Sequence, residues 1–533
     1  MIRPADYPPP AVDPFGAPTD PEPVEVDVAI VGAGPAGLAA AIRLGQLAPH
    51  LSVAVLEKGT AVGSHLLSGA VVRPGPLREL VGDFPSYGEV PGEAVYLLTQ
   101  RRAVRVPTPP TMRNEGNVVV SLSQLGRWLA ERAEAGGATV LPETAAVALL
   151  VDDERVVGVR TGDKGRGRDA EETARFEPGS DVRAKVTILA EGTAGHLTGA
   201  AVARFGLGGV NAQVWALGVK EVWRVARPLS RVIHTLGWPL RTAARWREFG
   251  GSFIYPLGEE LVSLGLVVGL DYADAELSVH DLLQSLKLHP LVRKLLDGGE
   301  RVQWGAKTIP EGGFLSLPRR CSAPGLLLCG DAAGFVNVPA LKGVHLAVET
   351  GRLAAEAAAS GELESYDAAL RSSWLWAELR EVRNVRQAFG RGLWLGGALA
   401  GAMTLTRGRF PSRDRRNEPD AAQPVVTGAG RRAPAPDGKL TFDKLSSVFL
   451  SGNRTREDQP SHIRIASPVP RELGELWVRM CPAQVYEVGE EHPDGTVDVQ
   501  VASSNCVQCG AITAKGGRLT PPEGGSGPEY TLT

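Results

Sequence analysis

Cysteine is scarce in this sequence, with five residues in a chain of 533, too few for a disulfide framework. Three of them, Cys481, Cys506 and Cys509, lie in the last hundred residues. This grouping favours metal or cluster ligands in a reducing compartment, for which the cytoplasm is the default. The scarcity of cysteine therefore directs attention to one small C-terminal segment.

A large excess of charge of one sign is also missing. The formal net charge is −3, and no long block of like charges occurs along the chain. A protein with this balance has no broad electrostatic attraction for polyanions. We therefore expect no nucleic acid partner.

Long hydrophobic runs are absent as well. No segment reaches the roughly 18 to 20 apolar residues needed to cross a bilayer. The first 23 residues hold eight prolines and no apolar core of a signal peptide, so we expect residues 1–24 to form a disordered, extended arm. The hydrophobic content of 43% nonetheless supports a large core and two or three domains.

The first folded segment carries a dinucleotide-binding motif. An apolar strand leads into Gly32, Gly34 and Gly37, spaced as G-x-G-x-x-G, and an Ala/Leu-rich helix follows. The first glycine permits a tight turn, the second a close pyrophosphate, and the third close helix–strand packing, with the diphosphate on the helix N-terminus. Glu57 ends the next strand, where a carboxylate accepts hydrogen bonds from ribose hydroxyls, and Lys58 beside it joins the predicted site.

A second motif indicates which dinucleotide binds. Gly330 and Asp331 follow a buried strand, so Asp331 is expected at the carboxyl edge of the sheet, where an acid suits a ribityl hydroxyl. Gly343 begins an Ala-rich helix whose amides are placed to face the flavin. Together these residues predict FAD rather than NAD. Residues 428–433 also fit G-x-G-x-x-A, but no strand precedes them and prolines follow, so we interpret them as a false positive.

One uncharged segment, residues 392–406, is a candidate for attachment to a membrane surface. Arg391 precedes it, and Arg407 and Arg409 follow it. Just before it, three arginines recur every three residues, on one side of an expected helix: Arg380, Arg383 and Arg386. An apolar segment with cationic flanks suits insertion among anionic headgroups, although a buried core helix would show the same pattern.

The C-terminal cysteines form a Cys-Pro pair and a Cys-x-x-Cys pair, a ligand pattern typical of iron–sulfur proteins. The next position in step with this spacing is Ile512, which cannot ligate iron. The alternatives are a [4Fe–4S] cluster with a non-cysteine fourth site, a [3Fe–4S] cluster, another metal such as zinc, or no cluster. Asn505 and Thr513 are possible oxygen donors without a spacing argument.

The whole pattern resembles the electron-transfer flavoprotein:ubiquinone oxidoreductase family of membrane-associated FAD and iron–sulfur proteins. The resemblance covers nearly the whole chain after the N-terminal arm. It is carried by GAGPAGLAAAIRL, HTLGWPL, FGGSFIYPL, GFVNVPALKGVH, LSSVFLSGNRTREDQPSHI, CPAQVYE and NCVQC.

The resemblance implies several sites and partners. It places a quinone headgroup at Gly250 and Gly251, which would otherwise indicate only a bend before a strand. It implies a second shallow membrane contact at Leu66, Leu67, Val71 and Val72. The family's cluster is [4Fe–4S] with four cysteines, of which only three have counterparts here. The implied partners are electron-transfer flavoprotein, ubiquinone or menaquinone, and a lipid surface.

We therefore predict an α/β protein: a Rossmann-like FAD-binding domain, an interleaved mixed-sheet quinone domain and a small ferredoxin-like iron–sulfur domain. We expect monotopic attachment on the cytoplasmic face of a bacterial inner membrane. The predicted segments are an arm at 1–24, an FAD domain at 25–200 plus 320–370, a quinone domain at 201–319, anchor helices at 371–410, a linker at 411–437 and the cluster domain at 438–533.

The predicted activity is transfer of electrons from reduced electron-transfer flavoprotein through FAD, and a cluster if one binds, to a membrane quinone. Two other classes share parts of the pattern. One is an FAD-dependent reductase or hydroxylase of a small or lipid substrate with a degenerate cluster domain. The other is a non-enzymatic membrane-surface subunit whose flavin is structural.

Overall fold

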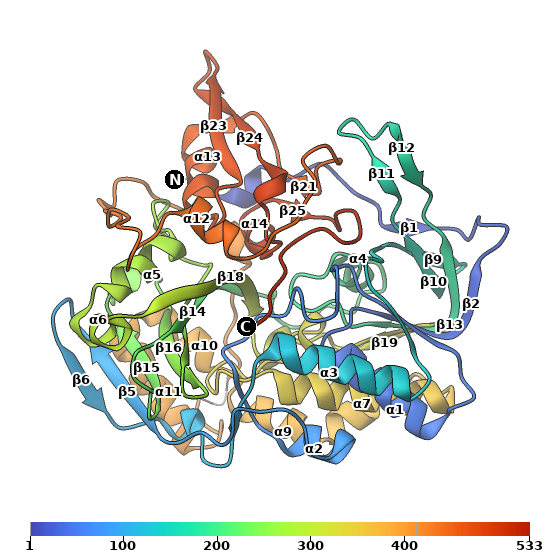
Figure 1. Ribbon diagram of the computed structural model, residues 1–533, viewed down its shortest axis with the longest axis horizontal. Helices are drawn as coiled ribbons and strands as arrows, with labels where there is room; N and C mark the ends of the chain where they lie inside the picture. Colours follow the sequence, from blue (N-terminus) through green and yellow to red (C-terminus); the bar gives the residue numbers. More distant parts are fainter. Residues whose placement is uncertain (1, 412) are drawn as a thin grey trace.

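Two large sheets organise the chain, and a smaller C-terminal module lies above them (Figure 1). The computed structural model describes residues 2–411 and 413–533. One sheet has nine strands and the other seven, with helices packed against both. The predicted mixed α/β class is confirmed.

The nine-stranded sheet carries the predicted nucleotide-binding motif. Consecutive residues at the end of β2 and throughout β3 are buried, as expected for strands covered on both faces. β2 lies between β13 and β3, and these three strands run parallel. In order, the main path is β1 (Phe15–Gly16), β9 (Ala146–Asp152), β10 (Arg155–Thr161), β13 (Asp181–Leu189), β2 (Val24–Val31), β3 (Val53–Leu56) and β8 (Thr139–Leu141), with β20 (Leu326–Leu328) pairing β13 and β19 (Ser322–Ala323) pairing β20.

Helices α1, α3 and α7 lie side by side against this sheet (Figure 1), and α1 packs on both of the others. Small residues let α1 and α7 approach closely. A Cβ on Gly351 of α7 would lie 2.1 Å from the carbonyl oxygen of Ala36 in α1. The helices of this part are α1 (Pro35–Leu47), α2 (Gly75–Val81), α3 (Leu122–Ala135), α4 (His196–Arg204), α7 (Val344–Ser360) and α8 (Ser365–Ser372).

The seven-stranded sheet is mixed, because β15 runs parallel to β5 while the other neighbours are antiparallel. Helices α5 (Val279–Lys287) and α6 (Pro290–Leu296) belong to the same part, and α5 packs on the sheet. The strand order is β18 (Glu300–Pro310), β14 (Trp215–Arg224), β17 (Leu261–Gly269), β16 (Gly250–Leu257), β15 (Val232–Gly237), β5 (Glu93–Leu98) and β6 (Ala103–Val106). Residues 93–106 thus belong to this sheet, although the sequence assigned them to the FAD domain.

The segment after α8 is helical, as expected for residues 371–410. It forms α9 (Trp374–Glu381), α10 (Val385–Ala388) and α11 (Leu393–Leu405), separated by turns. Arg386 is buried and pairs with Asp271 and Glu311, at 2.7 and 2.9 Å, so it does not face a headgroup layer. The prediction for Arg386 was wrong because carboxylates of the second sheet attract the guanidinium inward. No helix in the described residues has the length and hydropathy required to cross a bilayer.

The second membrane contact implied by the resemblance is wrong at Val71 and Val72. Val71 and Val72 form β4, which pairs with β7 (Val118–Val119), and they are 8% and 1% exposed. Leu66 and Leu67 line an internal cavity. Strand pairing therefore buries Val71 and Val72, and Leu66 and Leu67 are half-buried at the cavity rather than placed at a lipid surface.

The C-terminal module contains a three-stranded sheet and short helices. Its elements are α12 (Lys444–Phe449), β21 (Ile463–Arg464), β22 (Val469–Pro470), α13 (Arg471–Met480), β23 (Tyr486–Glu491), β24 (Thr496–Val501), α14 (Ala511–Ala514) and β25 (Arg518–Leu519). Its last residues return to the flavin side: Arg127 donates to the carbonyl of Tyr530 at 2.7 Å, and Ser123 N to that of Thr533 at 3.0 Å. A separate hairpin, β11 (Lys164–Arg166) and β12 (Glu172–Glu177), lies near the module (Figure 1).

The N-terminal arm is ordered in the described residues, contrary to expectation. Phe15 and Gly16 extend the nine-stranded sheet, and the amides of Thr19 and Asp20 donate to the carboxylate of Asp181. Ile2 forms a β-bridge with Val425. Prolines disfavour helix interiors but allow an extended chain to pack, and this arm finds partners that its composition does not reveal. Met1 lies outside the described residues.

The predicted linker crosses the surface between α11 and the module. Within residues 413–437, the structure has one 3₁₀ turn, Asp420–Ala422, and two β-bridges, from Val425 to Ile2 and from Val426 to Asp274. Residues 428–433 follow no strand, and the Gly428 amide donates to Glu276 at 2.8 Å. The interpretation of this G-x-G-x-x-A string as a false positive is thus consistent with its local structure.

A buried lysine in β14 predicts a pH dependence of stability. Lys220 is 1% exposed, and burial lowers its pKa to about 7. Because the unfolded chain binds this proton more tightly, stability should rise from pH 7 to pH 10, by at most about 4 kcal/mol from this group. Lys220→Met should flatten that rise in the thermal unfolding midpoint. If the unfolding midpoint of the variant rose with pH as steeply as that of the parent, Lys220 would not be the source of the pH dependence.

Candidate functional site

One cavity of about 790 Å³ joins the predicted flavin and quinone positions. The carboxyl ends of the first sheet form one wall, the second sheet another, and α11 lies at the far end. This volume falls in the usual range for sites of small organic ligands. Among its lining residues are Gly32, Gly34, Glu57, Lys58, Gly250, Gly251, Asp331 and Gly343.

The glycine turn has the geometry that its spacing predicts. Gly32 has φ +103°, and a Cβ there would lie 2.4 Å from the carbonyl oxygen of Ala190. A Cβ on Gly37 would lie 2.1 Å from the carbonyl oxygen of Gly32, so this glycine permits the helix to approach the turn. Around Gly34 there is open space, with the nearest atom, in Leu66, 3.7 Å from a Cβ. Gly34 thus leaves room for a ligand at the N-terminus of α1.

Glu57 is held at the end of β3 by backbone donors. The amide of Ala33 donates to Oε2 at 3.2 Å, and that of Gly59 to Oε1 at 2.8 Å. These bonds orient the carboxylate toward the cavity rim, where it retains acceptor capacity for a ribose. Lys58 also lines the cavity, and burial lowers its pKa.

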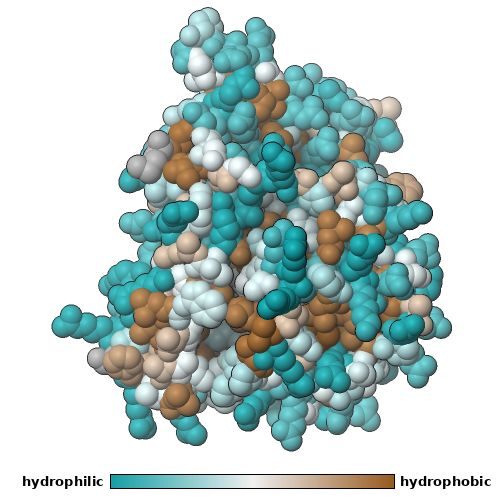
Figure 2. Space-filling model, turned by 90° about the vertical axis from the view of Figure 1, so that its left-hand side faces the viewer, coloured by the Kyte–Doolittle hydropathy of each residue, from teal (hydrophilic) through white to brown (hydrophobic). Residues whose placement is uncertain are grey.

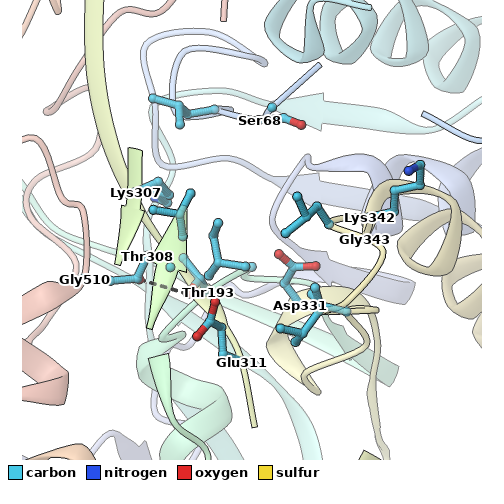
Figure 3. Close-up of a pocket in the computed structure, with 18 of the residues that line it drawn as sticks. Ser68, Thr193, Lys307, Thr308, Glu311, Asp331, Lys342, Gly343 and Gly510 are labelled. Carbon is cyan, nitrogen blue, oxygen red and sulfur yellow. Dashed lines mark hydrogen bonds between the residues drawn. The ribbon is translucent and has the colours of Figure 1, made fainter. Parts of the chain in front are cut away.

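The second motif lies across the cavity. Gly330 packs against α1, where a Cβ would lie 2.8 Å from that of Ala36, and its amide donates to Thr350. Asp331 extends its carboxylate into the cavity beside Gly343, the residue before α7 (Figure 3). Burial raises the pKa of Asp331 to about 6, because few groups compensate its charge. A ribityl hydroxyl would supply the missing hydrogen bond.

Gly250 and Gly251 line the same cavity at the start of β16. A Cβ on Gly250 would lie 2.0 Å from the carbonyl oxygen of Val267, and one on Gly251 would lie 2.5 Å from that of Thr235. Both glycines are therefore required by close strand packing, whatever ligand they face. His234 and Tyr255 also line the cavity and share a 2.6 Å hydrogen bond, and burial lowers the pKa of His234 to about 3.

The loop between Cys506 and Gly510 meets the cavity through β18. The carbonyl of Cys509 accepts from Thr308 N at 2.7 Å and from its hydroxyl at 2.9 Å. The carbonyl of Gln508 accepts from Lys307 Nζ at 3.2 Å. Gly510 lies beside Thr308, whose hydroxyl is 3.0 Å from that of Thr193 (Figure 3). The cysteine loop and the flavin cavity thus share a wall.

The three C-terminal cysteines come together in the buried core of the module. Cys481 follows α13 and is 5% exposed, and Cys506 is 6% exposed. The amides of Ala483 and Gln508 point at the sulfurs of Cys481 and Cys506, each at 3.4 Å. The pKa of Cys509 is raised to about 12, by burial and then by the neighbouring thiol of Cys481. Across residues 2–411 and 413–533, no three His, Cys, Asp or Glu side chains are arranged around a single metal ion.

Comparison with known proteins identifies the family. The model described as "Electron transfer flavoprotein-ubiquinone oxidoreductase, 4Fe-4S" matches residues 438–531, and "ETF-QO, ubiquinone-binding" matches residues 215–309. A third model, the Thi4 family, matches residues 21–74. The electron transfer flavoprotein-ubiquinone oxidoreductase of Pseudomonas aeruginosa is 40% identical over 95% of this chain and 98% of its own length. This chain belongs to the electron transfer flavoprotein-ubiquinone oxidoreductase family.

Mitochondrial members of the family are equally similar. The protein of Oryza sativa subsp. japonica is 39% identical over 96% of this chain and 93% of its own, and that of Homo sapiens is 40% identical over 95% and 89%. Two solved structures, each 19% identical, share the fold over 72% of this chain. They are a geranylgeranyl bacteriochlorophyll reductase-like protein from Thermoplasma acidophilum, with a TM-score of 0.56 and 92% of its chain covered, and the flavin-dependent brominase Bmp2, with 0.51 and 94%.

FAD and an iron–sulfur cluster are the cofactors of this family member, and the residues present fit both. For FAD, the fit rests on the open space at Gly34, the carboxylates of Glu57 and Asp331, and the cavity between them. For the cluster, it rests on three neighbouring thiols, of which Cys481 and Cys506 are buried and each have a backbone amide directed at the sulfur. Such amides stabilise the negative charge of a cluster.

Sequence reasoning missed several residues that line the cavity of this oxidoreductase. Thr193, Thr308, His234 and Tyr255 belong to no spaced motif, and only folding brings them to the cavity. Lys307 gives a usable signal, because it is a charged residue inside the otherwise uncharged β18 stretch WGAKTIP. Burial lowers its pKa to about 8. An unexpected charge in an apolar strand is a sign of a functional or buried polar environment.

Proposed function

We propose that this chain accepts electrons from reduced electron-transfer flavoprotein and delivers them to a membrane quinone, with FAD and the iron–sulfur cluster as its carriers. The observation that carries the proposal is the single cavity that joins Gly34 and Asp331 to Gly250, Gly251 and α11, with the cysteine loop at its wall. Family membership supports the same electron donor and acceptor.

In this proposal the chain's residues bind and orient the carriers. The turn at Gly32 and Gly34 and the N-terminus of α1 hold the FAD diphosphate, and Glu57 and Asp331 bind its hydroxyls. FAD, when bound, supplies the redox chemistry that exchanges electrons singly or in pairs. The bonds from Thr308 and Lys307 to the cysteine loop fix that loop against the flavin wall.

The quinone site we propose lies at Gly250 and Gly251. Without side chains, these residues leave the backbone open to a flat ring on the cavity side. His234 and Tyr255 support the wall as a hydrogen-bonded pair that stays neutral near pH 7, because burial lowers the pKa of the histidine and raises that of the phenol.

Substitution at the quinone site should separate the two half-reactions. Gly251→Ala places a Cβ 2.5 Å from the carbonyl oxygen of Thr235, so β16 must shift. A misplacement of this kind lowers a rate by up to about 100-fold. We expect slower reduction of quinone with unchanged FAD content and unchanged reduction by electron-transfer flavoprotein.

The matched control is Gly199→Ala in α4, where a Cβ meets open space. It should leave both half-reactions as in the parent. Equal quinone kinetics in Gly251→Ala and the parent protein would count against this location of the quinone.

We also propose monotopic attachment through α11 at the cytoplasmic face of a bacterial inner membrane. Trp394, Leu395 and Leu405 of α11 are 66%, 53% and 82% exposed, which costs free energy in water. Hydrophobic side chains are frequent over the lower half of the molecule, where α11 lies (Figures 1 and 2). Leu393, Gly397, Ala400 and Thr404 line the cavity, so quinone would enter beside the helix from the lipid.

Charged substitutions in α11 test the attachment. Trp394→Glu with Leu395→Glu removes two exposed apolar groups and adds negative charge, so we expect at least about tenfold weaker binding to anionic vesicles. Flotation with phosphatidylglycerol vesicles measures it. Leu445→Glu is the control, because Leu445 is 50% exposed in the C-terminal module. Undiminished flotation of the double variant would exclude α11 as the anchor.

The activity itself is tested in a steady-state assay. Reduced electron-transfer flavoprotein and a soluble ubiquinone analogue are mixed anaerobically with the holoprotein. We expect quinol formation that requires all three components. Quinol formation at the same rate without electron-transfer flavoprotein, from a nicotinamide donor alone, would refute the proposed donor.

A further inference from the structure

The cysteine loops of the C-terminal module have the backbone shape of an anion-binding cradle. Gln484, three residues after Cys481, has φ +52°, and Gln508, two residues after Cys506, has φ +51°. A left-handed residue in such a loop turns successive amides to one side, and this arrangement is common at iron–sulfur sites. The amides of Ala483 and Gln508 accordingly point at sulfur. Two loops and three thiols therefore form a site for a cluster.

Position 512 contributes nothing to this ligand set. Ile512 lies three residues after Cys509, in step with the Cys-x-x-Cys spacing, and it is 3% exposed inside α14. Its Cγ1 atom packs against Gly517, where an added Cβ would be 2.5 Å away, and Ile465 closes the same space. A branched hydrocarbon has no lone pair for iron, and its packing leaves no polar space for a bound water.

The amide nitrogens of Asn505 and Gln508 have other partners, whereas the amide oxygen of Gln508 is buried without one. The amide of Asn505 donates to the carbonyl of Gln484 at 3.2 Å, and Gln508 donates to the carbonyl of Ser526 at the same distance. Lys515, which follows α14, directs its ammonium over the ring of Tyr272. The nearby hydrogen bonds and packing thus favour a site with three protein ligands.

We propose that the cluster of this chain is [3Fe–4S], bound by Cys481, Cys506 and Cys509, with hydrocarbon from Ile512 at the corner where a fourth ligand would bind. This proposal on the cluster type rests on the proposed function only because it requires that a cluster is present. Such a cluster gains one electron from its donor and loses one to its acceptor, with no bond made or broken at the protein. The carrier thus differs from the [4Fe–4S] cluster of the matched family model.

The composition of the cluster is measured in the holoprotein, purified anaerobically. We expect about three irons and four sulfides per FAD, and a low-temperature EPR signal in the oxidised protein, because oxidised three-iron clusters are paramagnetic. Four irons per FAD with no signal until reduction would overturn the proposal. These readouts do not depend on turnover.

Ile512→Cys is the decisive variant, and Ile512→Val the matched control. After anaerobic reconstitution with iron and sulfide, Ile512→Cys should take up about a fourth iron per FAD, lose the oxidised EPR signal and gain one on reduction. Ile512→Val should behave as the parent protein. If Ile512→Cys folds and keeps the three-iron signal, position 512 does not set the cluster type and the proposal fails.

Two outcomes separate this proposal from the proposed function. Protein with FAD, no iron and full transfer from electron-transfer flavoprotein to quinone would overturn the cluster assignment and leave the proposed donor and acceptor standing. Protein with the three-iron signal but no such transfer would support the cluster assignment and overturn the function. If Ile512→Cys does not fold, the composition of the parent protein alone decides.

Discussion

Serine in place of Cys509 is expected to remove the cluster and nearly all electron transfer from electron-transfer flavoprotein to quinone. Cys509 is one of the three thiols of the C-terminal module, so its loss leaves two ligands, too few to retain a cluster. The fall in rate should exceed the roughly 100-fold that changes around a metal ligand produce. FAD content should stay near that of the parent, because Thr308 bonds the backbone of Cys509 rather than its sulfur.

Cys321→Ala is the matched control for this experiment. Cys321 is also buried, but it lies just before β19 in the flavin part of the chain. Iron content and activity should remain at parental levels. If Cys509→Ser retains iron, sulfide and full activity, the C-terminal cysteines do not hold the electron carrier.

Alanine in place of Gly34 is expected to deplete the protein of FAD without unfolding it. A Cβ at this position meets nothing nearer than 3.7 Å in the protein, so the apoprotein should keep its thermal stability. The same Cβ occupies the space that the motif reserves for the pyrophosphate. A loss of about 1.4 kcal/mol weakens FAD binding tenfold, and a direct steric conflict should cost at least that much.

Flavin absorbance and fluorescence after gel filtration measure this loss, and a thermal scan of the apoprotein measures folding. Gly37→Ala provides the contrast, because its Cβ would lie 2.1 Å from the carbonyl oxygen of Gly32 and should destabilise the fold itself. Full FAD occupancy in Gly34→Ala would place the pyrophosphate elsewhere.

The local motifs are the part of the site that the sequence predicts well. Gly32, Gly34 and Gly37 work through short-range geometry, so their spacing alone determines the turn and the open space. Asp331 and Gly343 meet across twelve residues, because one follows β20, the other precedes α7 and the chain between them forms turns. The cysteine pattern likewise predicts the set of three neighbouring thiols, of which Cys481 and Cys506 are buried.

Long-range pairing is the part that the sequence does not encode locally. Strand β5 joins the second sheet through β15, more than a hundred residues away, and no composition change marks residues 93–106 as its member. The sequence suggests a surface arginine at position 386, but in the fold Arg386 pairs with Asp271 and Glu311. The bonds from Thr308 to Cys509 connect two distant segments that share no motif.

The two apolar segments that the sequence placed at a membrane surface differ in exposure in the fold. Residues 392–406 and the segment around Leu66 and Val72 both read as apolar stretches. Only pairing of β4 with β7 buries the second, whereas Trp394 and Leu395 of α11 have no such cover in the described chain and stay exposed. Hydropathy cannot separate these cases, because it does not show whether another strand or helix covers the apolar segment in the fold.

Single-turnover reoxidation of the holoprotein tests the central claim most directly. The protein is reduced with dithionite under anaerobic conditions and mixed with a soluble ubiquinone analogue, and the flavin absorbance is followed with time. Electron delivery to quinone predicts rapid recovery of the oxidised spectrum, slowed in Gly251→Ala and unchanged in Gly199→Ala. A flavin that stays reduced with quinone but is reoxidised by an organic substrate would contradict the account.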